Sequence, residues 1–477
     1  MPVARNQPLE EEEMATAALP ALSQIDAPKL APQYPSHWLL GVGPQFQKDA
    51  MGTFFRATEH CGDVARLRFP LAPYTAHVLR HPDAVRHVLV DNQKNYGKQT
   101  RGYEKLRHVL GNGLVTSEGE FWKRQRRIAN PAFHRERIAH FSEVMVDCAG
   151  KMLDGWQARM AKGEPFDVSK EMMRVTLRVI GLTMLSTDVE GAAASEVGAA
   201  LDEVLHLTVN RIYDVVSWPK WVPTPGNRRF THAQGQLDGI VNRIIAQRRE
   251  SGEEHGDLLG MLMSARDAET GEGMTDEQLR DEAMTMFLAG HETTANALGW
   301  TLYLLSLHPD VERRLRAEVT GALGDRPPTL MDLEKLPYTD RVIKESMRLY
   351  PPVWVTARSA IEDDVISGYQ IPAGTWVFMS QYLTHRDPRF WENPEGFDPD
   401  RFLPEAEAAR PKHAYFPFAA GPRKCIGESF AVMEARLILA TIVQRSRLSI
   451  VPGFRVEIDP TITLRPKNGL WMTARAA

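Results

Sequence analysis

The sequence predicts a mainly α-helical fold with small β-sheets. From about residue 120 to 350 apolar residues recur with a period near 3.6, interrupted by polar breaks, which is typical of successive helices. The alternating segments VARLRF and YTAHVLR, separated by PLAP, predict a pair of strands. The segment GYQIPAGTWVFMS, with Pro-Ala-Gly at its centre, predicts a β-hairpin. The predicted strands are short and the helices long, so helices should dominate.

Composition excludes several classes of protein. The chain has 477 residues and a formal net charge of -4, so it shows none of the basic excess of a nucleic-acid binder. Its three cysteines, Cys61, Cys148 and Cys425, argue against a disulfide framework and are typical of the reducing cytoplasm. No run of roughly 18 apolar residues occurs, so we expect no membrane span.

The elements follow in order along the chain. Residues 1–33 are rich in Pro, Ala and Glu and predict a loose tail. HPDAVRHVLV continues the first strand pair as a helix, and SWPKWVPTPGNRRF (217–230) predicts a loop between helices. Its tryptophans, Trp218 and Trp221, are expected to pack in the ordinary way, or alternatively to form an apolar flap at a substrate entrance.

One long helix is defined at both ends. Thr275 and Gln278 form a capping box at its start, and His308-Pro309 ends it. The result is a helix of about thirty residues, long enough to cross a domain at about 1.5 Å per residue.

Several partial motifs lack an essential residue. His291-Glu292 begins like a zinc-protease motif, but Ala295 stands where the second histidine is needed. Ser429 in GESFA lacks the closing glycine of a nucleophile elbow, and GNG at 111–113 lacks the third glycine of a dinucleotide loop. We therefore assign none of these functions.

A single cysteine lies in an unusually constrained segment, FPFAAGPRKCIG (416–427). The glycines around Cys425 permit close backbone approach and positive φ, and the proline stiffens the loop. An apolar helical pattern follows, and a helix N-terminus beside the sulfur favours the thiolate, which is a soft metal ligand. The alternative is a nucleophile, which needs a histidine base, and none lies within ten residues on either side.

This segment resembles the haem-binding loop of the cytochrome P-450 superfamily. The pattern of Phe418, Gly421, Arg423, Cys425 and Gly427 is matched at every fixed position. The resemblance covers roughly residues 34–477 and implies a single haem-binding domain of the cytochrome P-450 fold, although length alone would suggest about three domains. It implies haem b as cofactor, with Cys425 as axial thiolate and Phe418 packed over the sulfur.

AGHETT (289–294), in the middle of the long helix, resembles the family's oxygen-binding segment. Gly290 should remove bulk where O₂ and substrate sit, and Thr293 can bond back to a carbonyl and open the helix. By resemblance, Glu292 and Thr293 deliver protons. The alternative is an ordinary helix that happens to contain a glycine and two threonines.

Two further sets of residues match the family in the expected order. One should be structural and support the cysteine loop: Glu345, Arg348 and Arg401. The other resembles the groups that bind the haem carboxylates, for which the guanidinium fork is suited: Trp122, Arg126, Arg358 and Arg423.

The resemblance implies an O₂-dependent monooxygenase that inserts one oxygen atom into a hydrophobic substrate such as a fatty acid or terpenoid. THRDPRFWENPEGFDPDRF is similar to the eukaryote-like branch, which includes fatty-acid and alkane hydroxylases, in a chain otherwise similar to soluble bacterial members. The resemblance implies substrate contacts from the loop around 96–115, the 185–230 region, the helix before Gly290 and residues near Val353 to Thr356. Their apolar members favour a hydrophobic substrate, the alternative being plain core packing: Phe287, Leu288, Val353 and Val355.

Electrons should come from a separate ferredoxin or flavodoxin with its reductase. Only 52 residues follow Cys425 (477 minus 425), too few for a flavin domain. A basic set is expected to form a docking face for this acidic partner, the alternative being an ordinary solvated helix face with Arg126 turned inward: Lys123, Arg124, Arg126, Arg127 and Lys424.

Other haem-thiolate functions remain as alternatives. A peroxide-driven hydroxylase or an isomerase often lacks the acid–threonine pair, and a haem sensor or carrier has no use for it. The presence of Glu292-Thr293 therefore favours the monooxygenase.

Overall fold

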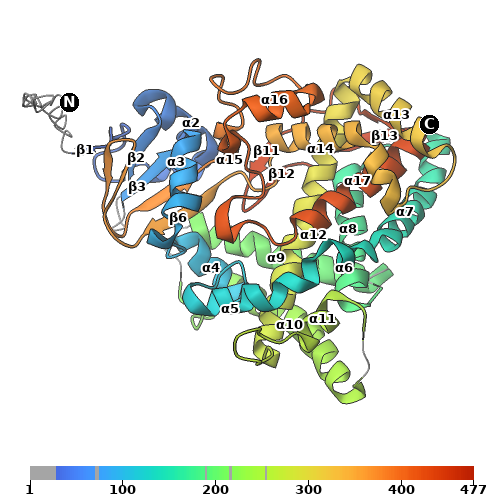
Figure 1. Cartoon of the computed structure of the whole chain (residues 1–477), viewed down its shortest axis with the longest axis horizontal. Coiled ribbons are helices and arrows are strands. Elements are labelled where there is room, and N and C mark those ends of the chain that lie inside the picture. Colours follow the sequence, from blue (N-terminus) through green and yellow to red (C-terminus); the bar gives the residue numbers. More distant parts are fainter. Residues whose placement is uncertain (1–27, 70–74, 189–190, 214–217, 253–254) are drawn as a thin grey trace, which may run out of the picture.

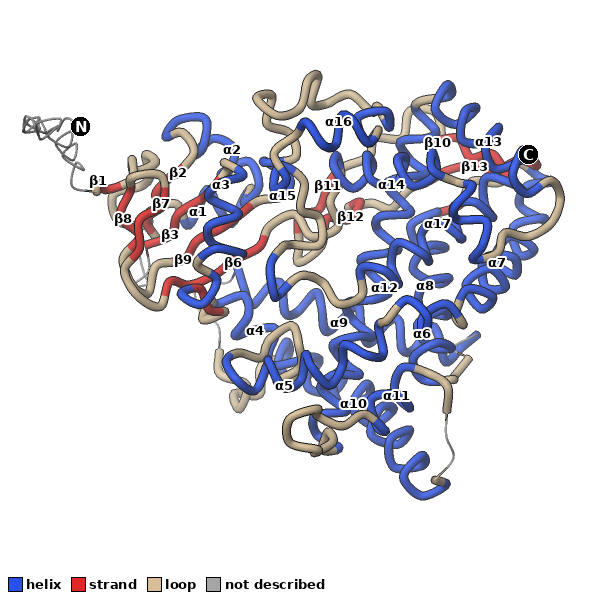
Figure 2. The backbone as a smooth tube through the Cα atoms, viewed as in Figure 1, coloured by secondary structure: helices blue, strands red, loops and turns tan. Residues whose placement is uncertain are grey.

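The computed structural model describes residues 28–69, 75–188, 191–213, 218–252 and 255–477. Helices form most of the molecule, and the largest sheet lies at the side nearest the N-terminal end of the described chain (Figures 1 and 2). The predicted mainly α-helical fold with small sheets is confirmed. The helices are α1 (Gly43–Lys48), α2 (Ala50–Cys61), α3 (Pro82–Arg86), α4 (Arg101–Leu110), α5 (Gly119–Ala129), α6 (Arg135–Ala139), α7 (Ser142–Lys162), α8 (Val168–Leu185), α9 (Gly191–Tyr213), α10 (Pro225–Ser251), α11 (Leu258–Ser264), α12 (Asp276–Leu307), α13 (Pro309–Leu323), α14 (Pro337–Leu349), α15 (Gln381–Thr384), α16 (Pro404–Ala409) and α17 (Glu428–Arg445).

The main sheet has the strand order β2-β3-β9-β6-β4. The predicted strand pair is confirmed, because β2 and β3 are antiparallel with Val64 opposite Leu79. β3 then pairs with β9 in parallel, which brings the first part of the chain beside a segment some three hundred residues later. The strands are β1 (Lys29–Leu30), β2 (Val64–Arg68), β3 (Thr75–Leu79), β4 (Tyr96–Gly97), β5 (Phe166–Asp167), β6 (Thr356–Ala360), β7 (Asp364–Ile366), β8 (Tyr369–Ile371), β9 (Trp376–Met379), β10 (Ser446–Ile450), β11 (Ile458–Pro460), β12 (Leu464–Pro466) and β13 (Trp471–Ala476).

The predicted hairpin at GYQIPAGTWVFMS is wrong. Both strands exist, but β8 pairs with β7 and β1, whereas β9 pairs with β3 and β6. The Pro-Ala-Gly turn, with Gly374 at a φ of 77°, therefore connects two different sheets. Alternation and turn residues identified the strands, but the partner of each is chosen by long-range pairing.

Helix α12 begins and ends where the sequence predicts. Thr275 and Gln278 form the capping box, and His308 is the C-cap. The helix is buried on nearly all sides because α8, α10, α14 and α17 pack around it (Figure 1). It is the central helix of the fold, and one of its faces forms a wall of the site described below.

The chain joins the sheet region before residue 34. Residues 1–27 of the expected tail lie outside the described ranges, whereas Lys29 and Leu30 pair in parallel with Tyr369 and Gln370. Backbone hydrogen bonds of this edge strand therefore hold the last part of the segment that the sequence assigned to the tail.

The predicted loop at 217–230 ends earlier than expected. Ser217 lies outside the described residues, and α10 already begins at Pro225, with the Thr224 hydroxyl accepting a 3.1 Å hydrogen bond from the N–H of Asn227. Proline at the first helical position favours this start. Trp218 and Trp221 are 63% and 83% exposed, so the expectation of ordinary packing is wrong for both.

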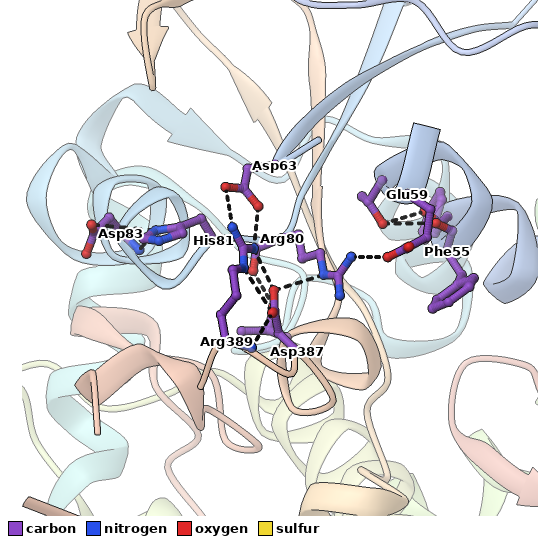
Figure 3. Close-up of polar contacts among 11 residues, drawn as sticks. Phe55, Glu59, Asp63, Arg80, His81, Asp83, Asp387 and Arg389 are labelled. Carbon is purple, nitrogen blue, oxygen red and sulfur yellow. Dashed lines mark hydrogen bonds and ion pairs between the residues drawn. The ribbon is translucent and has the colours of Figure 1, made fainter. Parts of the chain in front are cut away.

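A charge cluster fixes the segment that precedes the site (Figure 3). The Arg389 guanidinium donates to Asp63 at 2.9 Å and to Asp387 at 2.6 Å. Arg80 pairs with Asp387 at 2.9 Å and also with Glu59. The cluster ties the segment after α15 to the end of α2 and to β3.

Candidate functional site

Most of the predicted site residues line one cavity of about 800 Å³, which we call the central cavity. α12 forms one wall, and the loop before α17 forms another. The remaining walls come from α4, α5, α9 and the strands β6 and β9. A volume of this size suits a cofactor together with a small molecule.

The cysteine loop (residues 416–427) has a strained and closely packed backbone. Gly421 has a φ of 69°, and a Cβ there would lie 1.9 Å from the carbonyl oxygen of Leu89. Only glycine satisfies both conditions. The N–H of Cys425 donates to the carbonyl of Phe418 at 3.0 Å, which closes the loop around the cysteine.

The sulfur of Cys425 faces the central cavity. The residue is exposed there although protein surrounds the loop. Burial raises the pKa of the Cys425 thiol, while the N–H of Gly427 and the nearby Arg126 cation act in the opposite direction and favour the thiolate. The predicted donor from the start of α17 is thus present.

Phe418 and Gly427 line the same cavity. Gly427 has a φ of -85°, so positive φ does not explain this glycine. A Cβ at Gly427 would meet no protein atom within 4 Å. Because the residue lines the central cavity, the room it leaves lies beside Cys425 and is available to a bound group.

On α12, Ala289, Gly290 and Thr293 line the central cavity. The Thr293 hydroxyl donates back to the carbonyl of Ala289 at 2.7 Å, as predicted, but the expected local opening of the helix is wrong, because α12 is helical throughout Asp276–Leu307. A Cβ on Gly290 would approach the side chain of Ile180 to 2.7 Å. The glycine therefore serves close packing of α8 on α12 as well as leaving space at the cavity wall.

Glu292 is turned away from Thr293. Its carboxylate accepts a 2.6 Å hydrogen bond from the Thr463 hydroxyl and lies 3.7 Å from the Arg465 guanidinium. Glu292 is buried and does not line the central cavity. The expected acid–threonine pair is therefore not in contact in this conformation, because Thr463 and Arg465 of the β11–β12 segment are the partners of the acid.

The residues predicted to bind carboxylates meet at one side of the cavity. All four line it: Trp122, Arg126, Arg358 and Arg423. Arg423 lies over the Trp122 ring at 4.1 Å and donates to the carbonyl of Ser117 at 2.9 Å. Arg358 donates to the Tyr103 hydroxyl at 3.1 Å.

Lys98 belongs to the same group and was missed from the sequence. Its ammonium donates to the carbonyls of Leu114 and Val115, at 3.3 and 2.7 Å, in the lining of the central cavity. Burial and the cations Arg358 and Arg423 hold the pKa of Lys98 well below its usual value. An isolated lysine in a loop gives no sequence pattern by which it could have been found.

Positive charge exceeds negative charge at this side of the cavity. Burial and Arg358 lower the pKa of Arg423 to about 10. Glu118 is the acid that opposes this for both Arg423 and Lys98. Buried cations with so little compensation favour binding of an anionic group, above all one with carboxylates.

The predicted acid–arginine cluster is present and lies outside the central cavity. Glu345 and Arg348 are fully buried, and Arg348 donates to both carboxylate oxygens at 2.7 and 2.8 Å. Arg401 lies 3.4 Å from the same carboxylate. Arg348 also donates to the carbonyls of His385, Pro394 and Gly396, so the cluster braces the loops that precede the cysteine.

Only some of the predicted substrate residues line the central cavity. Val353 and Val355 line the central cavity, but Phe287 and Leu288 do not. Phe287 faces a second, apolar cavity of about 30 Å³ between α8, α9, α10 and α12. Met286 and Ala289 hold the expected positions instead, because the face of α12 toward the cavity is offset by one residue from the prediction.

The basic residues expected to dock a partner do not form a free positive face. Arg126 lines the cavity. The other members are paired with acids: Lys123 with Glu120, Arg124 with Asp267 and Glu272, Arg127 with Asp267 and Glu269, and Lys424 with Glu428. Their charges are thus compensated within the chain.

Within the described ranges, no helix has the length and apolar character needed to span a bilayer.

Known proteins show the same architecture. A cytochrome P450 family model matches residues 32–472. Cyclooctatin synthase of Streptomyces melanosporofaciens is 39% identical over 84% of this chain and 86% of its own length. Cyclooctat-9-en-7-ol 5-monooxygenase of the same organism is 38% identical over 82% and 84%. The crystal structure of the cytochrome P450DA heme domain superposes with a TM-score of 0.86 at 29% identity, covering 94% of this chain and 98% of that one. The family implies a haem with cysteine-thiolate ligation, and this chain belongs to the cytochrome P450 family.

Proposed function

We propose that this protein is a haem-thiolate monooxygenase that inserts one oxygen atom from O₂ into a hydrophobic substrate. The observation that carries the proposal is the central cavity, where a cysteine sulfur on one wall shares the space with Gly290 and Thr293 of α12. A single cavity thus holds a soft ligand, a hydroxyl and an apolar lining.

The residues present fit haem b. Cys425 would ligate the iron, and the cavity beside Gly427 leaves room for the ring. Basic side chains with little acidic compensation are available for the two carboxylates of the cofactor, and Trp122 completes this group: Lys98, Arg126, Arg358 and Arg423. When bound, the haem supplies the activation of O₂, in which one oxygen atom enters the substrate and the other leaves as water.

Side chains of the protein itself transfer the protons that the reaction consumes. The Thr293 hydroxyl, held by the carbonyl of Ala289, lines the cavity, and we assign it the role of proton donor. Glu292 would have to leave Thr463 and rotate toward Thr293 to recharge this hydroxyl. We propose this movement as the step that carries protons inward, since a carboxyl and a hydroxyl together suit proton relay.

The substrate we propose is largely hydrocarbon, of terpenoid type. The cavity lining supports this, because it is mainly apolar and includes Leu106, Leu114, Val209, Ile212, Met286 and Val353. The relative named cyclooctat-9-en-7-ol 5-monooxygenase acts, by its name, on an unsaturated alcohol. Fatty acids are the second class to be tested.

We propose that the chain from Pro28 to Ala477 acts as one haem domain, because Lys29 and Leu30 already pair with β8. We further propose that a separate ferredoxin or flavodoxin with its reductase supplies electrons in the cytoplasm. The sparse cysteines are typical of that compartment. Because Lys123, Arg124, Arg127 and Lys424 are paired with acids, we do not assign the docking surface of this partner to them.

The test is oxygen labelling. Haem-loaded protein is incubated with labelled O₂, a ferredoxin and its reductase, and panels of terpenes, terpene alcohols and fatty acids. We expect one labelled oxygen atom in a terpenoid product. Product formed only with added peroxide, or no product although substrates shift the haem spin state, would contradict an O₂-dependent monooxygenase.

A further inference from the structure

His385 lies between the acid–arginine cluster and the cysteine loop. It is the C-cap of α15 and is fully buried. The charge cluster of Asp63, Arg389 and Asp387 holds the segment two residues further along (Figure 3). The backbone of His385 is therefore fixed from outside the site, and its ring is directed at the loop.

The backbone carbonyl and the imidazole ring of His385 both accept hydrogen bonds. Its carbonyl accepts from the Arg348 guanidinium at 2.9 Å, and its Nε2 accepts from the N–H of Phe416 at 3.0 Å. A backbone N–H can only donate, so Nε2 carries no proton. The ring is therefore neutral, with its proton on Nδ1, and burial together with Arg348 holds the pKa of His385 well below its usual value.

The surroundings fit this neutral tautomer. Nδ1 lies near the backbone of Met347 and Arg348, and this backbone favours a proton on Nδ1. The contact does not have the geometry of a regular hydrogen bond. The ring packs on Tyr415, with centroids 5.0 Å apart, and meets Phe416 edge-on at 5.3 Å. Its orientation is thus determined by packing as well as by the hydrogen bond to Phe416.

From Phe416 the hydrogen bonds continue to the cysteine. The carbonyl of Phe416 accepts from Ala419 at 3.0 Å, and the carbonyl of Phe418 accepts from Cys425 at 3.0 Å. Ala419 has a φ of 58°, a left-handed conformation that a residue with a Cβ adopts only when its surroundings hold it. The first turn of the loop is strained and needs an anchor at its start.

We infer that His385 is a positioning residue whose unprotonated Nε2 anchors the cysteine loop at Phe416 and so couples the Glu345–Arg348 cluster to the sulfur of Cys425. The inference rests on the proposed function in taking Cys425 as the haem ligand. Nothing in the loop sequence itself identifies this residue, because it acts from 31 positions before Phe416.

The test replaces the ring by two side chains of similar length. His385→Gln keeps an acceptor that can reach the N–H of Phe416, and His385→Met has no comparable acceptor. His77 supplies a matched control, since it is a buried histidine on β3 whose ring nitrogens have no hydrogen-bond partner within the described ranges. Each variant is studied as the haem-loaded full chain.

Two readouts are recorded: the fraction of the reduced CO complex with the strongly red-shifted Soret band, and amide exchange over residues 415–425. We expect His385→Met to lower that fraction by at least half and to speed exchange about tenfold, as the loss of one hydrogen bond allows. His385→Gln should recover most of both, and His77→Met should leave both unchanged.

Equal loss in the Gln and Met variants, or no loss in either, would overturn the inference. If His385→Met does not fold, the amide of Phe416 in the unmodified protein decides the question, since exchange there as fast as in exposed loops would exclude the anchor. Absence of the red-shifted band in the unmodified protein would instead count against the proposed function, while the exchange comparison would still test the anchor.

Discussion

The carboxylate of Glu292 accepts its 2.6 Å hydrogen bond from Thr463, on the segment between β11 and β12, and not from its neighbour Thr293 on the same helix. This hydrogen bond holds the Glu292 carboxylate outside the cavity that Thr293 lines. Asn296 donates to the Thr463 hydroxyl at 3.2 Å and extends this network.

Thr463→Val should destabilise the protein, because it leaves the buried Glu292 carboxylate without its nearest donor. The expected loss in free energy of unfolding is about 2 kcal/mol, typical of a hydrogen bond to a charged group. Urea unfolding measures it. Thr463→Ser retains the hydroxyl and should stay near the original stability; equal loss in both variants would show that the hydroxyl is not the cause of the loss.

Thr293→Ala should leave folding and haem content unchanged but lower the product formed per electron pair by roughly tenfold or more. The reason is that we assign the proton-donor role to this hydroxyl, which lines the cavity on α12. Thr301 offers a matched control, because its hydroxyl makes the same 2.7 Å bond to a carbonyl four residues earlier but lies outside the central cavity. Peroxide and product are quantified together, and equal coupling in Thr293→Ala and Thr301→Ala would refute the relay.

Gly421→Ala should prevent the cysteine loop from forming. The positive φ and the carbonyl of Leu89 both oppose a side chain there, at a cost above about 3 kcal/mol. Gly427→Ala meets no protein atom and should leave apoprotein stability unchanged while weakening haem uptake. Thermal unfolding of the apoprotein and haem titration separate the two effects, and unchanged haem uptake in Gly427→Ala would show that the bound group lies elsewhere.

Glu282 should make stability depend on pH. Burial raises its pKa from 4.5 to about 8, opposed by the N–H of Leu114. Because the folded-state pKa is raised, the stability that Glu282 contributes is fully present below about pH 4.5 and is lost as the pH rises through about 8. Glu282→Gln should remove this loss, on the order of 3 kcal/mol between pH 5 and 8. Chemical denaturation across that range measures it, with the exposed Glu334→Gln as control; a parallel pH profile in Glu282→Gln and the original protein would contradict the assignment.

The sequence predicted the features that local chemistry determines. Thr275 and Gln278 fixed the start of α12, and the spacing of Glu345 and Arg348 fixed their ion pair. The cysteine loop was found because its glycines, proline and arginine lie next to the cysteine. Short-range patterns of this kind are little affected by the rest of the fold.

Features that depend on distant partners could not be predicted. Glu292 is turned by a threonine 171 residues away. The strands β8 and β9 join different sheets because each finds a partner remote in sequence. Lys98 joins the cation group only because the fold brings its loop to the cavity. The face of α12 toward the central cavity is offset by one residue from the prediction, so Met286 lines that cavity and Phe287 does not. The charges of the basic helix were visible in the sequence, but the acids that neutralise them, such as Asp267, were not assignable.

The most direct test of the account is the absorption spectrum of the reduced CO complex of the haem-loaded protein, recorded beside Cys425→Ser. Thiolate ligation predicts a strongly red-shifted Soret band in the unmodified protein and its disappearance in the variant, at equal haem content. An unshifted band in the unmodified protein, or a shifted band that survives in Cys425→Ser, would contradict the assignment of Cys425 as the haem ligand.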